Sequence, residues 1–403
     1  MARKSLLMVI LLLALLVVNG LPALGQDDTF VFGVVLVGPK NDGGWSQAHY
    51  EAGQKIEENV PGTKMLLFES LNTADAPETT LLDVVTDMVS QGAKVIFTTS
   101  DEFEEDTDTV AAQFPDVVFI NDTGSRVLEK KSPENVGNIN GQLEWTKAIS
   151  GCAAGLATQT GKIGYLGALI NAETRRLAAA TYLGARYCYE KYAGNDPATL
   201  EFTVTWIGFW FNIPGFTLDP TAESNTFVDN GADVLISGID TTETLTVADQ
   251  KTKEGTPVYG IAQDNANGCD AAPDICLGVP YYNWYPLYRD IINQVKDGTW
   301  KPSWQWFPPD FKDINDPETS AVGFKFGTAL TDDQLANLND YIATMSEFGS
   351  NPDNAETIFP WTGPLNLQDG SELAPEGENV ALLDIWYLPQ LLEGMTGTSS
   401  TQS

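Results

Sequence analysis

Histidine and basic residues are scarce in this 403-residue chain, and each scarcity excludes a class of function. The only histidine is His49, which leaves too few ligands for a zinc site. Only 22 Lys and Arg oppose 55 Asp and Glu, so the formal net charge is −33. A charge of this size repels phosphate backbones and anionic lipid surfaces, and nucleic acid is therefore not expected as a partner.

Motifs for phosphate binding and catalysis are also missing. The first Gly-containing loop matches neither G-x-x-x-x-G-K-[ST] nor G-x-G-x-x-G. The acidic run 101–108 lacks the spacing of a calcium loop, and it is expected to begin a helix whose macrodipole its carboxylates complement. No serine or cysteine nucleophile is evidently paired with His49. We therefore predict a binding protein without metal or cofactor, not an enzyme.

The amino terminus has the pattern of a secretory signal peptide over residues 1–26. Arg3 and Lys4 precede the apolar run 6–18, and small residues follow at 23–25. The run is shorter than the ~20 residues of a membrane span, which argues against an anchor. No cysteine lies near the cleavage point. The expected location is the periplasmic or extracellular side of the cell membrane, without a cysteine-linked lipid.

The four cysteines all follow this segment. An even number in an exported chain favours disulfides over metal binding. Cys269 and Cys276 bound the short segment CDAAPDIC and are expected to pair locally, which leaves Cys152 with Cys188.

Apolar β-branched runs alternate with amphipathic segments through most of the chain, which predicts an α/β fold with parallel sheets. The expected strands are 30–37, 65–69, 95–99, 117–121, 162–166, 202–207, 234–237, 257–261 and 277–281. Expected helices include 76–91, 143–157, 172–192, 242–254, 283–296 and 332–346.

Two successive series of this kind predict two lobes with a ligand cleft between them. The expected parts are an N-terminal lobe (27–141), a C-terminal lobe (142–275), a return segment to the first lobe (276–300), an extension packed on the lobes (301–395) and a disordered tail (396–403). Hinges are expected near Asn140, Ala262 and Tyr281, and the protein is expected to be a monomer.

Residues that end parallel strands border such a cleft and are candidate ligand contacts. Trp45 is the main candidate, because its indole lies in a polar Gly loop and suits a flat ring. The predicted site residues are Asn41, Asp42, Trp45, His49, Ser100, Asp122, Trp210, Asp240, Asp264, Asn283 and Trp284. Further strand-end candidates are Asn121, Phe209, Phe211, Gly238, Gln263, Asn265 and Tyr281. A strand-end Asp can equally cap a helix, so Asp122 and Asp240 keep that alternative.

Several motifs in order carry a family resemblance: NDGGWSQAHYEAG, TWIGFWFNIPG, NGADVLISGIDTTET, YGIAQDN and YYNWYPLYRDIINQVKDGTW. With them the chain resembles the basic membrane protein family of solute-binding proteins. This resemblance implies a type I periplasmic-binding-protein fold, a purine nucleoside or nucleobase as ligand, and the membrane permease of an ABC importer as partner. It also implies that Trp45 stacks on the purine. The lysine that nucleoside-binding relatives carry is absent from LGVPYYNW, so ribose recognition stays open.

Other functions remain as alternatives. The same site could serve the ligand-binding partner of a signalling receptor, and an aromatic wall also suits a sugar ring. A secreted nucleoside hydrolase is disfavoured because the chain lacks a D-x-D-x-x-x-D-D calcium cluster near its first strand.

Overall fold

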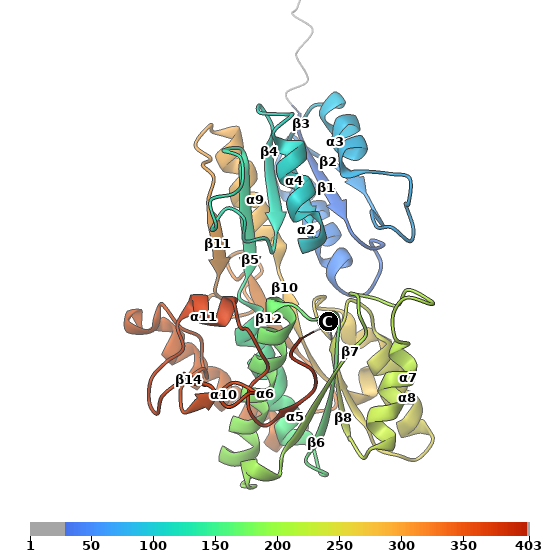
Figure 1. Cartoon of the computed structure of the whole chain (residues 1–403), viewed down its shortest axis with the longest axis vertical. Coiled ribbons are helices and arrows are strands. Elements are labelled where there is room, and N and C mark those ends of the chain that lie inside the picture. The colour runs from blue at the N-terminus through green and yellow to red at the C-terminus, as the bar shows by residue number, and fades with distance from the viewer. Residues whose placement is uncertain (1–28, 401–403) are drawn as a thin grey trace, which may run out of the picture.

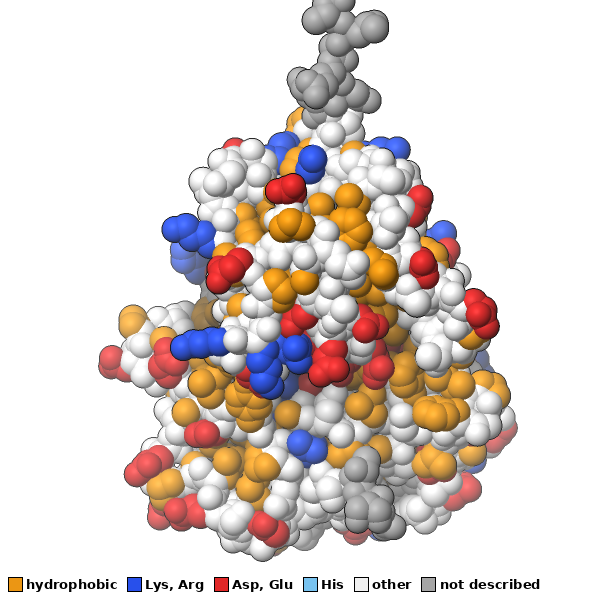
Figure 2. Space-filling model, turned by 45° about the horizontal axis from the view of Figure 1, so that its top comes forward, with side chains coloured by type: hydrophobic (Ala, Val, Ile, Leu, Met, Phe, Trp, Pro, Cys, Tyr) orange, Lys and Arg blue, Asp and Glu red, His pale blue; other side chains and the backbone are white. Residues whose placement is uncertain are grey.

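The computed structural model describes residues 29–400, which form two α/β lobes one above the other (Figure 1). The predicted signal peptide lies outside the described residues. None of the helices within residues 29–400 has both the length and the apolar character that a membrane crossing requires. Acidic side chains gather across the middle of the face shown in Figure 2, next to a few basic ones.

The N-terminal lobe contains a six-stranded parallel sheet in the order β11-β5-β4-β3-β1-β2. Its strands are β1 (Phe30–Leu36), β2 (Thr63–Phe68), β3 (Ala93–Thr99), β4 (Val118–Asp122), β5 (Val136–Gly141) and β11 (Trp304–Phe307). Its helices are α2 (Trp45–Asn59), α3 (Leu81–Ser90), α4 (Glu104–Ala111) and α9 (Trp284–Lys296).

The C-terminal lobe contains a seven-stranded sheet in the order β12-β10-β9-β8-β6-β7-β15, in which only β12 runs antiparallel to its neighbour. Its strands are β6 (Lys162–Gly167), β7 (Glu201–Trp206), β8 (Val234–Gly238), β9 (Tyr259–Ile261), β10 (Cys276–Tyr282), β12 (Val322–Phe326) and β15 (Met395–Thr396). Its helices are α5 (Leu143–Ala157), α6 (Ala172–Lys191), α7 (Pro220–Asp229) and α8 (Glu243–Lys253).

The chain passes between the lobes at three places, and these differ in part from the expected boundaries. The passages follow β5, β10 and β11. Strand β10 was expected in the return segment but belongs to the second sheet, so the return begins with α9. Ala262 lies between β9 and β10 of the same sheet and is not a crossing. Strand β5 was not expected, because its sequence VGNING has no apolar alternation, although all six of its residues are buried.

The expected helix 76–91 is shorter in the structure and begins at Leu81. The cause is a capping box, in which the Thr80 hydroxyl accepts from the Asp83 amide and the Asp83 carboxylate accepts from the Thr80 amide. These bonds satisfy amides that an earlier start would have placed inside the helix.

The carboxyl-terminal extension adds strands to both sheets and covers the second lobe. It includes α10 (Asp332–Ser350), β13 (Leu365–Asn366), β14 (Glu372–Ala374) and α11 (Leu382–Trp386). Its side chains join the core of that lobe, where Trp361 and Trp386 are buried. The disorder expected from residue 396 onward is wrong for residues 396–400, which the structure describes as ordered. Thr396 pairs with Thr203 at the edge of β7, and the Ser399 carbonyl accepts from Arg175.

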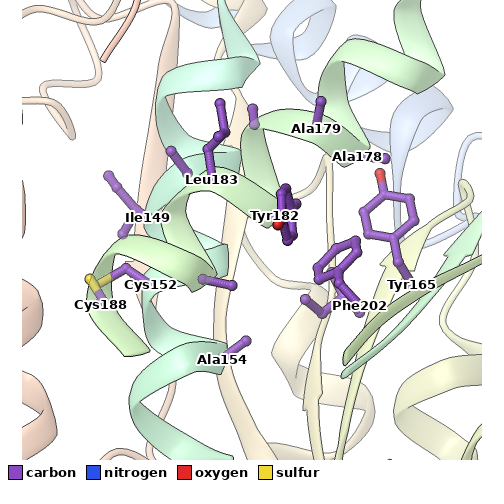
Figure 3. Close-up of a cluster of buried hydrophobic side chains, with 14 of the residues drawn as sticks. Ile149, Cys152, Ala154, Tyr165, Ala178, Ala179, Tyr182, Leu183, Cys188 and Phe202 are labelled. Carbon is purple, nitrogen blue, oxygen red and sulfur yellow. A yellow bond between two sulfur atoms is a disulfide. The ribbon is translucent and has the colours of Figure 1, made fainter. Parts of the chain in front are cut away.

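Helices α5 and α6 pack against each other, and Figure 3 shows side chains of both in one buried cluster with Tyr165 and Phe202. The structure contains both expected disulfides, and Cys152–Cys188 joins these two helices. Gly184 of α6 lies directly against the backbone of Ala148 in α5, so a Cβ at this position would overlap the Ala148 carbonyl oxygen.

We expect Gly184→Ala to destabilise the protein by about 1–3 kcal/mol, because a rigid backbone contact cannot yield to the added methyl group. On an open helix the same change would stabilise by up to about 1 kcal/mol. Urea unfolding measures the difference. Glu190→Ala, at the exposed end of α6, is the control and should shift stability by less than about 0.5 kcal/mol. An equal or higher stability for Gly184→Ala would contradict the packing.

Candidate ligand-binding site

A cavity lies between the two lobes, at the carboxyl ends of the parallel strands of both sheets. We call it the interlobe cavity. It combines aromatic rings with carboxyl, amide and hydroxyl groups, and no Lys, Arg or His side chain lines it. The lining residues are Val37, Trp45, Ser100, Asp101, Thr123, Glu173, Leu177, Trp210, Asp240, Gln263, Asp264 and Tyr282.

Trp45 forms the aromatic wall of the N-terminal lobe. It is the first residue of α2, and its indole Nε1 donates to the Thr99 carbonyl oxygen at 2.6 Å. The edges of Tyr282 and Trp284 meet it at centroid distances of 5.2 and 5.3 Å. The start of the helix is fixed by Asp42, whose carboxylate accepts from the Ser46 and Gln47 amides at 2.9 and 3.0 Å. The ring orientation is therefore set by hydrogen bonds and packing on several sides.

Trp210 and Asp240 form the facing wall in the C-terminal lobe. The Asp240 amide donates to the Trp210 carbonyl oxygen at 2.9 Å, which ties the two residues together. The buried Trp210 Nε1 forms no hydrogen bond of ordinary geometry within residues 29–400, but it lies near enough to the Asp101 carboxyl group to oppose the rise that burial causes in the pKa of that group. Trp210 and Trp45 line the same cavity from opposite lobes, so a flat ring can be held between elements that are far apart in sequence.

The two lobes touch around the cavity. Gly44 lies against the Asp240 backbone so closely that a Cβ would overlap the carbonyl oxygen. Asn171 donates to Asp101 at 3.1 Å, and Asn265 donates to Glu51 at 3.0 Å, each across the gap between lobes. The structure is therefore a closed arrangement of the lobes.

Burial in this cavity favours the protonated form of its carboxyl groups. It raises the pKa of Asp101 to about 6, with the charge of Glu102 adding to the effect. It raises the pKa of Glu173 to about 7, although Arg176 opposes the shift. The pKa of Asp240 lies well above its usual value because of burial and the neighbouring carboxylates, chiefly that of Asp264.

Five of the predicted site residues line the interlobe cavity: Trp45, Ser100, Trp210, Asp240 and Asp264. Gln263, one of the further strand-end candidates, also lines it. Three others lie outside the cavity and have structural partners or face solvent. Asn41 is exposed, Asp42 binds the amides at the start of α2, and Asn283 donates to the Pro317 and Ser320 carbonyl oxygens.

The remaining three, His49, Asp122 and Trp284, are buried behind Trp45. His49 stacks on Trp284 with ring centroids 4.2 Å apart. Its Nδ1 lies 2.6 Å from the Tyr288 hydroxyl, which donates to Asp122 at 3.0 Å. Complete burial lowers the pKa of His49 well below its usual value, so the ring is neutral. This group supports Trp45 and does not line the cavity.

Asp101, Glu173 and Tyr282 line the cavity but were not predicted. Asp101 was included in a run explained by the helix dipole, and it does begin a short 3₁₀ turn over Asp101–Phe103. Glu173 lies in the first turn of α6, beyond the loop after β6. The ends of β3 and β6, which precede Asp101 and Glu173 in the chain, were the available signals in the sequence. If the candidates had included the first helical turn after each strand end, both acids would have been among them.

The raised carboxyl pKa values predict the pH dependence of stability. The folded protein keeps a proton on Glu173 up to about pH 7, whereas the unfolded chain releases it near its usual 4.5. The unfolded state thus binds fewer protons in this window, and stability falls as pH rises from about 5 to 7, by at most about 1.4 kcal/mol per pH unit per group.

Melting curves of ligand-free protein at pH 5.5, 6.5 and 7.5 test this dependence. Glu173→Gln should flatten it, while Glu190→Gln on the same helix should leave it as in the wild type. An identical slope for wild type and Glu173→Gln would show that Glu173 titrates as an exposed acid.

Comparison with known proteins identifies the family through a sequence model. The sequence model of the PnrA-like ABC transporter substrate-binding proteins (Bmp) matches residues 30–307. A purine-binding protein from Brucella abortus (strain 2308) is 26% identical over 362 residues, which is 87% of this chain and 89% of that protein. A Haloferax volcanii protein that carries the name of an ABC transporter glucose-binding protein is 27% identical over 275 residues. The matched residues are 68% of this chain and 62% of the Haloferax protein.

Among solved structures, an ABC transporter solute-binding protein from Conexibacter woesei DSM 14684 superposes with a TM-score of 0.58 at 18% identity, covering 79% of this chain and 97% of that one. At this identity the likeness shows the fold alone, which is that of type I periplasmic binding proteins. The substrate-binding proteins of ABC importers bind a small molecule outside the cytoplasm and pass it to a membrane permease. The family match extends over most of both lobes, and the chain therefore belongs to the PnrA-like (Bmp) family of ABC transporter substrate-binding proteins.

Proposed function

We propose that this protein binds a purine nucleobase in the interlobe cavity and delivers it to the permease of an ABC importer. The observation that carries the proposal is the pair of indoles, Trp45 and Trp210, that line one cavity from opposite lobes among carboxyl and amide groups. A base stacked on an aromatic side chain gains roughly 1–3 kcal/mol per contact. A ring held from both sides would also couple binding to lobe closure.

The polar groups suit the edges of a purine. Ring N–H groups and exocyclic amines are donors, and carboxylates accept from them. The unprotonated ring nitrogens are acceptors, and a carboxyl group kept neutral by burial, such as Asp240, can donate to them. An anionic ligand is disfavoured because the lining contains four carboxyl groups and no basic side chain.

The sequence favours a base over a nucleoside, because LGVPYYNW lacks the lysine that nucleoside-binding relatives carry. The purine-binding name of the Brucella relative supports the same ligand class.

A sugar is the second candidate, because one relative is named for glucose and because aromatic walls with carboxylates also suit sugar hydroxyls. The two ligands differ in their spectroscopic effect: a stacked purine quenches indole fluorescence more strongly than a saturated ring. Titrating adenine, guanine, hypoxanthine, adenosine and glucose in parallel separates them.

Trp45→Ala should weaken adenine binding by about 5- to 150-fold, since it removes one stacking contact. Isothermal titration calorimetry measures the loss. His49→Phe is the matched control: it keeps an aromatic ring on Trp284 without reaching the cavity. The control should keep affinity within about threefold of the wild type. Equal losses in both variants would mean that Trp45 acts only through the core behind it.

Gly44→Ala should hold the lobes apart, because its methyl group would overlap the Asp240 carbonyl oxygen only in the closed arrangement. We expect at least a tenfold weaker affinity for adenine with an unchanged far-UV circular dichroism spectrum, and a larger radius of gyration by small-angle X-ray scattering in the presence of adenine. Asn41→Ala, exposed on the same loop, should change neither. Wild-type affinity in Gly44→Ala would refute this closure contact.

A further inference from the structure

A buried lysine lies beneath the interlobe cavity without lining it. Lys147 projects from α5 and is fully buried. Its Nζ donates to the Ser237 carbonyl oxygen at 3.0 Å and to the side-chain oxygen of Gln263. The Tyr165 ring lies nearby, with its centroid 5.2 Å from the ammonium.

Burial of this charge is costly, and its immediate partners are neutral. Within residues 29–400, no carboxylate lies within ion-pair distance of Lys147. An apolar side chain of similar length would avoid the desolvation penalty of several kcal/mol. The charges of Asp264 and Glu144, which lie farther away, offset part of this cost.

The ammonium does determine the orientation of the Gln263 amide. An ammonium has donors and no acceptor, so only the amide oxygen can face it. The amide nitrogen must then point the other way, and it donates to Asp264 Oδ2 at 2.9 Å. An amide nitrogen carries two hydrogens, and Gln263 lines the cavity. Its second hydrogen is available to a ligand.

Asp264 is held next to this amide by its own backbone. Its amide donates to the Pro280 carbonyl oxygen at 2.8 Å, and its carbonyl accepts from Tyr282 at 3.1 Å. Its φ of 70° is unusual for a residue other than glycine. Gln263 and Asp264 thus present a fixed donor beside a carboxyl group.

We infer that Lys147 is a positioning residue that fixes Gln263 as a hydrogen-bond donor, so that the Gln263–Asp264 pair recognises adjacent acceptor and donor atoms on one edge of the ligand. This inference rests on the proposed purine ligand. Adenine has such an edge wherever a ring nitrogen is next to its exocyclic amine or to a ring N–H. With a methionine at position 147, the amide could rotate and offer its oxygen instead.

The test uses adenine with its 1-deaza, 3-deaza and 7-deaza analogues, each of which replaces one acceptor nitrogen by C–H. In the wild type, the analogue that lacks the acceptor facing Gln263 should bind at least about tenfold more weakly than adenine, because the buried donor loses its partner. In Lys147→Met, the ratio between adenine and that analogue should fall below about threefold. Calorimetry gives the dissociation constants.

Gln263→Glu provides a second variant that does not depend on folding of Lys147→Met. Its carboxylate still accepts from Lys147 but offers no amide donor, so it should lose the same selectivity. Lys162→Met, a partly exposed lysine at the start of β6, is the control and should keep the wild-type ratio.

Each outcome decides the inference. Loss of selectivity in Lys147→Met with the control unchanged supports it, and loss of selectivity in Gln263→Glu supports the donor role of Gln263. Equal binding of all three analogues by the wild type, or unchanged selectivity in folded Lys147→Met or in Gln263→Glu, overturns it while leaving a purine as the ligand. Failure of the wild type to bind adenine or any other purine overturns the proposed function, and the inference with it.

Discussion

The burial of several carboxyl groups in one small cavity is the constraint on which the site depends. Asp101 belongs to the N-terminal lobe, and Glu173, Asp240 and Asp264 belong to the C-terminal lobe. If all four were ionised, closing the lobes would bring like charges together in a medium of low dielectric constant. Burial raises the pKa of Asp101 to about 6, that of Glu173 to about 7 and that of Asp240 well above its usual value, so closure favours the protonated forms of these three groups. A ligand with several hydrogen-bond donors can stabilise the ionised carboxylates and so replace part of this protonation.

The same constraint explains where the basic side chains near the cavity lie. Two of them, Arg176 and Lys147, are buried behind the residues that line it. The Arg176 Nε lies 2.6 Å from Glu144 Oε1, and the Lys147 ammonium donates to two neutral oxygens. The single histidine is kept neutral by complete burial. Among residues 29–400, the cavity surface thus offers acidic, amide, hydroxyl, aromatic and aliphatic groups but no basic side chain, which sets the chemistry of the ligand more narrowly than the fold does.

Much of this arrangement could be predicted from the sequence, because it depends on local patterns. The alternation of strands and helices indicated two α/β lobes, and the rule that ligands bind at strand ends found Trp45, Ser100, Asp240 and Asp264. The rule failed for Asp122, a strand-end residue whose side chain is buried in the core and not in the cavity. Tertiary packing decides toward which side of the sheet such a side chain points, and the local sequence does not show it. It also missed Glu173, which reaches the cavity from the first turn of a helix.

The central claim is that a purine base lies between the two indoles, and a crystal structure of the protein grown with adenine tests it most directly. We expect electron density for one planar bicyclic ring between Trp45 and Trp210, with its polar edge against Gln263 and Asp264. Density for adenine elsewhere, or an interlobe cavity that holds a different co-purified molecule despite saturating adenine, would contradict it.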